Sequence, residues 1–163
     1  MEKKIVNNTI NDIQEEIIKE FINIQKDGSG EDILYHIIEM GRQLSPMPEE
    51  MKTSNSTIHE CMSKVWISFK RPEAGVKNYN KMIYFGDSDS EIVKGIIALL
   101  FRIFNNQSYE DIIEANLFFI EKISLISFLG QQRAFGFATI VKKIKMIALL
   151  EQSRPRRGRP KKK

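Results

Sequence analysis

Hydrophobic positions recur at spacings of three and four residues in the first third of the chain, which predicts two amphipathic helices. The first apolar stripe comprises Ile10, Ile13, Ile17, Ile18, Phe21 and Ile24. The second comprises Ile33, Leu34, Ile37, Ile38 and Met40, and it ends near Gly41 and Leu44. Asp27-Gly28-Ser29-Gly30 separates the two stripes, and Pro46 and Pro48 stop helix formation after the second. We therefore expect two helices followed by a long polar loop that reaches Cys61.

Between Lys64 and Phe85 the pattern changes to one typical of strands. Val65, Ile67 and Phe69 alternate with Trp66 and Ser68. Pro72-Glu73-Ala74-Gly75 then predicts a turn, and a second apolar run follows at Met82-Ile83-Tyr84-Phe85. We expect two or three antiparallel strands in this part of the chain.

The second half of the chain is again helical in pattern. Ser88 and Glu91 have the spacing of a capping box, which predicts that a helix starts near Asp89. This helix is apolar on nearly all sides, as expected of a central core helix, through Ile92, Val93, Ile96, Leu99, Leu100, Ile103 and Phe104. Ser108 and Asp111 indicate the start of a shorter helix, and a last helix is expected from about Arg133 to Leu150.

Length and composition limit the class of protein. The chain has 163 residues, of which 42% are hydrophobic and 28% charged, so we expect one globular domain over residues 1–151. A single cysteine excludes an internal disulfide, and no Cys/His cluster has zinc-site spacing, so a reducing, cytoplasmic location is expected. The longest apolar run is Ile96–Phe101, too short to cross a membrane.

The positive charge is concentrated at the C-terminus. The net charge is +4, but the final SRPRRGRPKKK carries seven of the 25 Lys and Arg residues, and the remainder is slightly acidic. We expect residues 152–163 to form a disordered basic tail. Arg157-Gly158-Arg159-Pro160 resembles an AT-hook, the arm that reads a narrow DNA minor groove. Nucleic-acid binding through Arg156–Lys163 and a solvated basic terminus therefore both stay open.

Four ordered motifs carry a family resemblance. They are Tyr35-His36-Ile37-Ile38-Glu39-Met40-Gly41-Arg42-Gln43-Leu44, then Cys61-Met62-Ser63-Lys64-Val65-Trp66, then Gly86-Asp87-Ser88-Asp89 with Ile92-Val93-Lys94-Gly95, and finally Leu129-Gly130-Gln131-Gln132-Arg133 with Gly136. The motifs resemble Y-x-x-I-E-x-G-x-x-L, C-x-S-x-V-W and L-x-x-x-R-x-x-G of the SufE family and its paralogue CsdE, the sulfur acceptors of iron–sulfur cluster assembly. The resemblance spans most of the chain.

The resemblance implies a fold and a function. The fold would be α+β and similar to IscU, with a small antiparallel sheet of about three strands packed on one side by helices. Cys61 would accept persulfide sulfur from a pyridoxal-phosphate (PLP)-dependent cysteine desulfurase of the SufS or CsdA type, stimulate that enzyme, and pass the sulfur to a SufB-containing, SufBCD-like scaffold. The PLP would belong to the desulfurase, and this chain would need neither a cofactor nor a metal. The expected partner-binding or loop-supporting residues are Glu60, Ser63, Trp66, Asp89 and Arg133.

The surroundings of Cys61 suit sulfur transfer. A thiolate must attack the outer sulfur of a persulfide, and a chain without a second thiol does not resolve the product into a disulfide. We expect the polar run before Cys61 to allow movement, and Ile58, Met62 and Trp66 to form an apolar pocket. Such a pocket would raise the thiol pKa, so that Cys61 reacts only when docked.

Two departures from the family pattern fall near Cys61. The family has glycine at the position of Glu60. Glutamate restricts the backbone more than glycine does, and it places a negative charge beside the thiol. Ser56 stands where the family has asparagine.

Several of these side chains have a second interpretation. His59 and Cys61 could form a hydrolytic pair, but no orienting third group is evident. Asp87 and Asp89 could be acid–base carboxylates, or more simply favour a helix N-terminus, and Asp89 could equally contact the desulfurase. His36 lies beside a core stripe and is expected to be structural.

Two rival functions compete with sulfur transfer. An IscU-type scaffold would need several thiolate ligands, whereas this chain has one cysteine and two histidines. A DNA-associated protein would act through the basic tail. Deleting residues 152–163 would separate a sulfur carrier, which keeps loading, from a DNA binder, which loses salt-dependent affinity.

Overall fold

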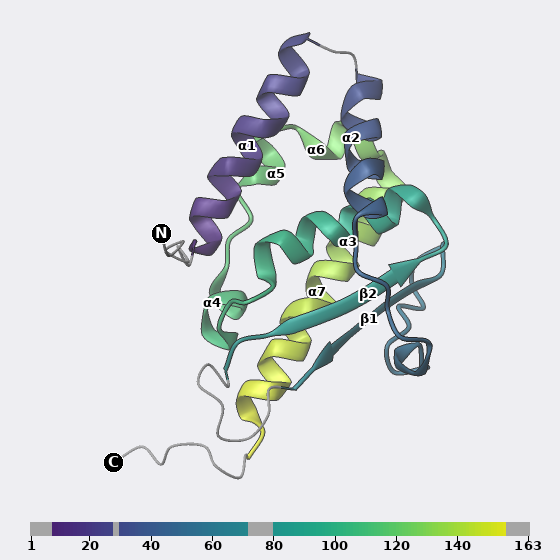
Figure 1. Ribbon diagram of the computed structural model, residues 1–163, viewed down its shortest axis with the longest axis vertical. Coiled ribbons are helices and arrows are strands. Elements are labelled where there is room, and N and C mark those ends of the chain that lie inside the picture. The colour runs from purple at the N-terminus through teal and green to yellow at the C-terminus, as the bar shows by residue number, and fades with distance from the viewer. Residues whose placement is uncertain (1–7, 28–29, 72–79, 156–163) are drawn as a thin grey trace, which may run out of the picture.

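A two-stranded antiparallel sheet packs with one face against the helices (Figure 1). The computed structural model describes residues 8–27, 30–71 and 80–155. The order of elements is α1 (Ile10–Asp27), α2 (Gly30–Arg42), the 3₁₀ helix η1 (Glu49–Met51), β1 (Val65–Lys70), β2 (Ile83–Ser88), α3 (Glu91–Phe104), α4 (Tyr109–Glu114), α5 (Phe119–Lys122), α6 (Leu125–Leu129) and α7 (Gln131–Ser153). The α+β class is therefore confirmed.

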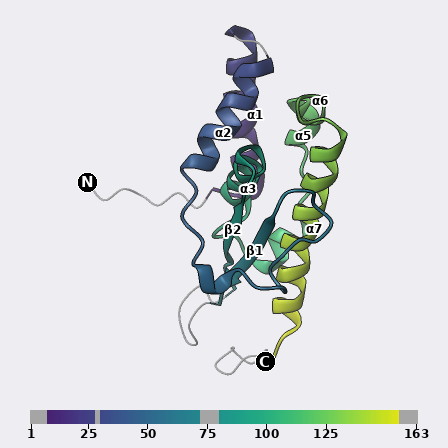
Figure 2. The same cartoon turned by 90° about the vertical axis from the view of Figure 1, so that its right-hand side faces the viewer.

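The sheet has one buried face because its side chains alternate. Ile67 lies opposite Gly86 in the register, and Tyr84 lies two residues along on the same face; all three are buried. The Tyr84 hydroxyl donates a hydrogen bond of 2.9 Å to the carbonyl of Ile144 in α7. Figure 2 shows α3 and α7 beside the sheet, with α1 and α2 on the far side of α3. Helices thus cover one face of the sheet, as expected.

The number of strands differs from the expectation of about three. Within the described residues the sheet has two strands, and Thr57 adds only a single bridge to Trp66. The expected turn at Pro72–Gly75 lies outside the described residues.

Helices α2 and α3 cross in unusually close contact at two glycines. A Cβ atom on Gly95 would lie 2.1 Å from the carbonyl oxygen of Ile37, and a Cβ atom on Gly41 would lie 2.6 Å from the backbone nitrogen of Gly95. Real Cβ atoms do not approach backbone atoms so closely, so both positions require glycine. Both glycines belong to the sequence motifs described above, and they explain why the core helix α3 can lie so close to α2.

The expected capping box at the start of α3 is wrong. Strand β2 continues to Ser88, and the helix begins only at Glu91, with Ser90 as its N-cap. The Ser90 hydroxyl accepts from the backbone N–H of Val93 at 3.3 Å, whereas the Ser88 hydroxyl accepts from the N–H of Ser90 at 3.1 Å. Pairing of Ser88 with Val65 keeps Ser88 in the sheet and moves the cap by two residues.

The C-terminal helices are partly as expected. Ser108 caps α4 by accepting from the N–H of Asp111 at 3.2 Å, which confirms that start. The short helices α5 and α6 were not predicted, and α7 begins at Gln131, after Gly130 with φ of 80°. Helix α7 continues through Ser153, and residues 156–163 lie outside the described residues, so the basic tail stays a prediction. None of the described helices is long and apolar enough to cross a membrane.

Candidate functional site

Cys61 lies in the middle of a six-residue loop that is fastened at both ends. At one end, the N–H of Ile58 donates to the carbonyl of Val65 at 2.9 Å, and the carbonyl of Ser56 accepts from the N–H of Ile67 at 2.8 Å. At the other end, the N–H of Lys64 donates to the carboxylate of Asp89 at 2.9 Å, and the N–H of Asp89 donates back to the carbonyl of Lys64 at 3.3 Å. These bonds leave residues 59–64 as a short loop that projects from the start of β1.

The Cys61 side chain is half-buried against helix α7. Its sulfur lies 3.6 Å from the position that a Cβ atom would take at Gly136. It also borders a pocket of about 540 Å³, which we call the Cys61 pocket. The first turns of α7 form one wall of this pocket, through Gln131, Gln132, Arg133 and Phe135. The thiol thus faces a space that can hold an additional atom, but it remains reachable from solvent.

Two effects make the resting thiol a weak nucleophile. Burial raises the pKa of Cys61, and the negative charge of the neighbouring Glu60 raises this pKa further. A thiol with a raised pKa carries less thiolate at neutral pH, and the thiolate is the reactive form. The sequence-based expectation of a thiol that is sluggish in the free protein therefore agrees with this setting.

The structure brings most of the predicted site residues together. Glu60, Ser63 and Arg133 line the Cys61 pocket. The exposed Arg133 is held by a weak bond of 3.5 Å from its guanidinium to the carbonyl of Leu129, so its charge is available at the rim. Asp89 supports the loop through Lys64 and does not cap a helix. Its geometry is that of a loop-supporting residue.

Of the three side chains expected to form an apolar pocket at Cys61, Met62 lines the Cys61 pocket, but Ile58 and Trp66 do not, so that expectation is wrong in part. Met62 is 86% exposed, so it leaves the pocket open to solvent, whereas Ile58 is buried and lines a neighbouring pocket. Trp66 lies on the face of β1 opposite the buried Val65 and Ile67, and the ammonium of Lys52 lies 4.8 Å above its ring. The cover over Cys61 comes from α7 instead.

The polar run before Cys61 is anchored by hydrogen bonds, and the expectation that it allows movement stays a prediction. The buried Ser56 hydroxyl donates to the carbonyl of Met51 at 2.7 Å and accepts from the N–H of Thr53 at 2.9 Å. The ammonium of Lys143 in α7 donates to the carbonyl of Asn55 at 2.7 Å. These bonds tie the segment that precedes residues 59–64 to η1 and α7.

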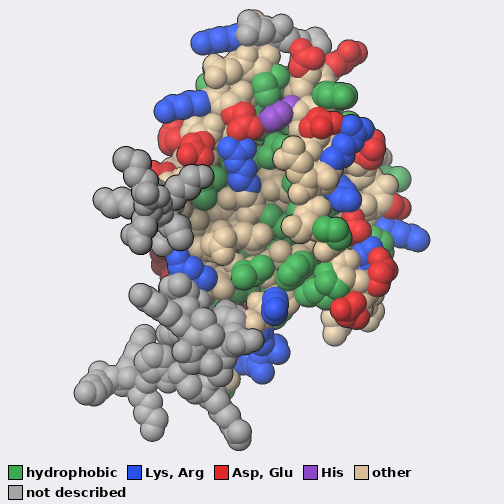
Figure 3. Space-filling view, viewed as in Figure 1, with side chains coloured by type: hydrophobic (Ala, Val, Ile, Leu, Met, Phe, Trp, Pro, Cys, Tyr) green, Lys and Arg blue, Asp and Glu red, His purple; other side chains and the backbone are tan. Residues whose placement is uncertain are grey.

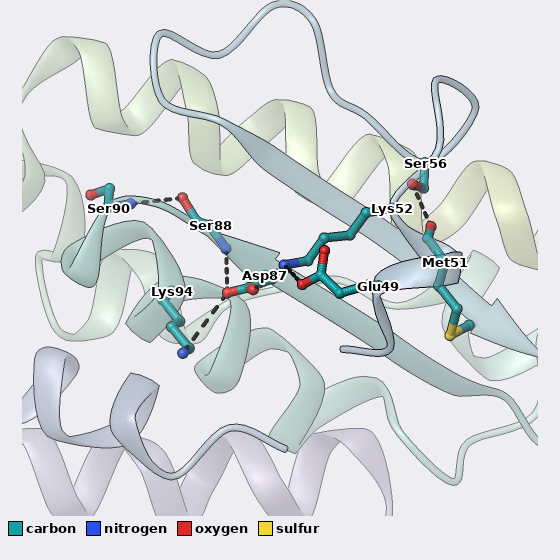
Figure 4. A network of polar contacts seen from close by, with 8 residues as sticks. All are labelled: Glu49, Met51, Lys52, Ser56, Asp87, Ser88, Ser90 and Lys94. Carbon is teal, nitrogen blue, oxygen red and sulfur yellow. Dashed lines mark hydrogen bonds and ion pairs between the residues drawn. The ribbon is translucent and has the colours of Figure 1, made fainter. Parts of the chain in front are cut away.

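A network of ion pairs attaches the segment around η1 to strand β2 (Figure 4). Lys52 contacts Asp87 at 2.8 Å and Glu49 at 2.9 Å, and Lys94 of α3 lies 3.8 Å from Asp87. Burial alone would raise the pKa of Asp87, but the hydrogen bond from Lys52 and the N–H of Ser88 lower it overall. Asp87 is therefore a structural anion that fixes the polar segment. No sequence motif pointed to Lys52 as its partner.

Neither histidine forms a hydrogen bond with the Cys61 thiol. His59 is exposed and lines a second pocket beside the loop. His36 contacts Glu20 at 2.6 Å and the edge of the Phe21 ring, so it is structural, as expected. Within the described ranges, no three His, Cys, Asp or Glu side chains are grouped to hold a metal ion.

Several residues of the Cys61 pocket were missed by sequence reasoning. They are Ser90 and Val93 at the start of α3, and Gln131, Gln132 and Phe135 at the start of α7. The glutamines and Phe135 flank Arg133 within one helical turn, so the motif that identified Arg133 also held the signal for them.

Comparisons with known proteins show which family the chain resembles in sequence and fold. The family model described as "SufE: Fe-S metabolism associated domain" matches residues 15–148. An uncharacterised SufE-like protein of Rhizobium meliloti (strain 1021) is 33% identical over 116 residues, which cover 71% of this chain and 81% of that protein. The solution structure of a hypothetical protein from Thermus thermophilus has a similar fold, with a TM-score of 0.67 at 16% identity, covering 87% of this chain and 97% of that one. The chain therefore belongs to the SufE family, whose role lies in iron–sulfur metabolism.

Proposed function

We propose that the chain is a sulfur carrier. Cys61 accepts the outer sulfur of a cysteine persulfide on a PLP-dependent cysteine desulfurase of the SufS or CsdA type, and it delivers that sulfur to a SufB-containing scaffold of the SufBCD kind. The observation that carries the proposal is the position of Cys61, the chain's one cysteine, at the middle of a short projecting loop beside a pocket of about 540 Å³. A reducing compartment such as the cytoplasm suits this role, because thiols stay reduced there.

The transfer is an exchange between two sulfur atoms. The Cys61 thiolate attacks the outer sulfur of the donor persulfide, a new S–S bond forms, and the S–S bond in the donor breaks. The electron pair leaves with the donor thiolate, which takes up a proton equivalent to the one that Cys61 lost. No net oxidation occurs, so the step needs no oxidant or reductant.

The pocket supports both the loaded and the unloaded states. In the unloaded state, burial and Glu60 keep the thiol protonated, which limits its reaction with other electrophiles. In the loaded state, the added sulfur extends into the pocket between the loop and α7. Arg133 at the rim supplies a positive charge that stabilises a thiolate or a persulfide anion nearby. Docking of the desulfurase then activates a thiol that is otherwise slow.

Intact-mass spectrometry tests the proposal directly. The full chain is incubated with a PLP-loaded SufS-type desulfurase and free cysteine, beside a Cys61→Ser control. The wild type is expected to gain one sulfur atom that dithiothreitol removes, and to increase the rate of alanine release, while Cys61→Ser gains none. Absence of added sulfur on the wild type, with a desulfurase that is active by alanine release, would overturn the proposal.

A further inference from the structure

A second pocket lies directly beside the Cys61 pocket. Its volume is about 450 Å³, and Glu60 and Phe135 line both pockets, so the two form neighbouring compartments of one surface. From Phe135 the second pocket follows α7 to Met146, a helical distance of about 16 Å. We call this second pocket the α7 groove.

The α7 groove has exposed apolar side chains near both ends, Phe135 and Met146, and two lysines towards its far end. Phe135 and Met146 are 60% and 43% exposed and line the same groove, so the groove presents two large apolar side chains to solvent. Lys142 and Lys143 line the same groove, and neither forms an ion pair with any described residue. Lys143 only donates to the neutral carbonyl of Asn55, so both positive charges remain without a counter-charge.

The charges in the groove give it a direction. Glu60, the acidic side chain that lines it, lies at the end next to Cys61, whereas the lysines lie further along α7. A carboxylate placed in the groove is therefore repelled from the thiol end and attracted to the lysine end. An extended segment of about five residues spans such a length. The groove thus suits a short segment with apolar side chains and a carboxylate at one end.

We propose that the α7 groove is a docking site for an apolar, carboxylate-bearing segment of the cysteine desulfurase, which Lys142 and Lys143 hold while the donor cysteine reaches Cys61. This inference rests on the proposed function and adds the chemistry of the partner surface. Continuity with the Cys61 pocket lets one partner occupy both compartments at once. The exposed Phe135 lies between them, where an interface is best shielded from water.

Lys142 is the residue to test, because Lys143 also anchors the polar run before the loop through Asn55. Binding of the full-length chain to a PLP-loaded SufS-type desulfurase is measured by isothermal titration calorimetry at two salt concentrations. Lys142→Glu is expected to weaken binding roughly tenfold, Lys142→Arg to bind as the wild type does, and the weakening to diminish at high salt. The matched control is Lys19→Glu, the same charge change at an exposed position on α1.

The outcomes separate this inference from the proposed function. Equal affinity of Lys142→Glu and Lys19→Glu, with wild-type Cys61 still gaining sulfur, would overturn the docking site alone. Failure of the wild type to bind the desulfurase would overturn both. A dimer of the wild-type chain that Lys142→Glu dissociates, seen by sedimentation, would assign the groove to a second copy and overturn the proposal. Thermal unfolding of each variant confirms that the fold is retained.

Discussion

Glu60 and Cys61 are neighbours in the sequence, and their side chains influence one another directly. Burial is the larger cause of the raised pKa of Cys61, and the negative charge of Glu60 adds to it. Glu60 forms no ion pair with any described residue, so no contacting cation neutralises its charge. A residue that slows the free thiol is consistent with a carrier that must react only with its partner.

Substitution of Glu60 should therefore make the free thiol more reactive. In Glu60→Gln the negative charge is lost, the pKa of Cys61 falls, and the thiolate fraction at pH 7.5 increases. At a pH below the pKa, the thiolate fraction increases about tenfold when the pKa of the thiol falls by one unit. We therefore expect iodoacetamide to alkylate Cys61 roughly two- to fivefold faster. The two pH–rate profiles should converge at high pH, where both thiols are ionised.

The matched variant Glu60→Asp keeps the charge and should retain the slow rate. Identical profiles for the wild type and Glu60→Gln would contradict the electrostatic role of Glu60 and leave burial as the whole cause of the raised pKa.

At the scale of helices and strands, local sequence patterns predicted most elements. They missed the elements that are too short to show a hydrophobic repeat. Helices α1 and α2 repeat apolar residues over several turns, and the Ser108 cap lies beside its helix in the sequence. Helices α5 and α6 have only four and five residues, too few for a periodic signal. The choice between Ser88 and Ser90 as the cap depended on pairing with β1, which no local pattern reports.

The candidate site was predictable only where a motif spanned it. Cys61, Ser63 and Arg133 lay in family motifs and meet at one pocket. The contact between Lys52 and Asp87 joins residues 35 positions apart in the sequence, and nothing in either segment indicates the other. Met62 lines the Cys61 pocket but is 86% exposed; apolar character alone does not show whether a loop side chain is shielded from solvent.

The crossing of α2 and α3 should be intolerant of any side chain at Gly95. In Gly95→Ala the new Cβ would lie 2.1 Å from the carbonyl oxygen of Ile37, so the helices must separate. We expect a loss of about 3 kcal/mol in the free energy of unfolding, or a fall in Tm of roughly 6–12 °C. Differential scanning calorimetry measures this change.

Gly136→Ala is the matched control for that substitution. Its Cβ would lie 3.6 Å from the sulfur of Cys61, an ordinary contact, and alanine favours the interior of α7. Its Tm should therefore equal or exceed that of the wild type. Equal melting of Gly95→Ala and Gly136→Ala would contradict the close crossing of α2 and α3.

Over the whole molecule, the folded part and the C-terminal residues differ in charge. Acidic and basic side chains are interspersed over the face in Figure 3. The basic surplus of the sequence comes from its last ten residues, Arg154–Lys163, and the rest is slightly acidic. The Cys61 site lies within the described part, and the last turns of α7 are fixed by the ion pair of Arg71 with the buried Glu151 at 3.3 Å. Fold and sulfur transfer should therefore be separable from the basic terminus.

Truncation after Pro155 tests that separation. It removes six basic residues but leaves α7 and the Arg71–Glu151 pair in place, so Tm and the sulfur loading of Cys61 should both equal those of the full chain. Affinity for duplex DNA at low salt should fall, since attraction to phosphates depends on these charges and the remainder is acidic. A full-length variant with the six residues changed to glutamine controls for length. Reduced loading in both variants would instead place the basic residues in contact with the desulfurase, because each retains the pocket and the thiol.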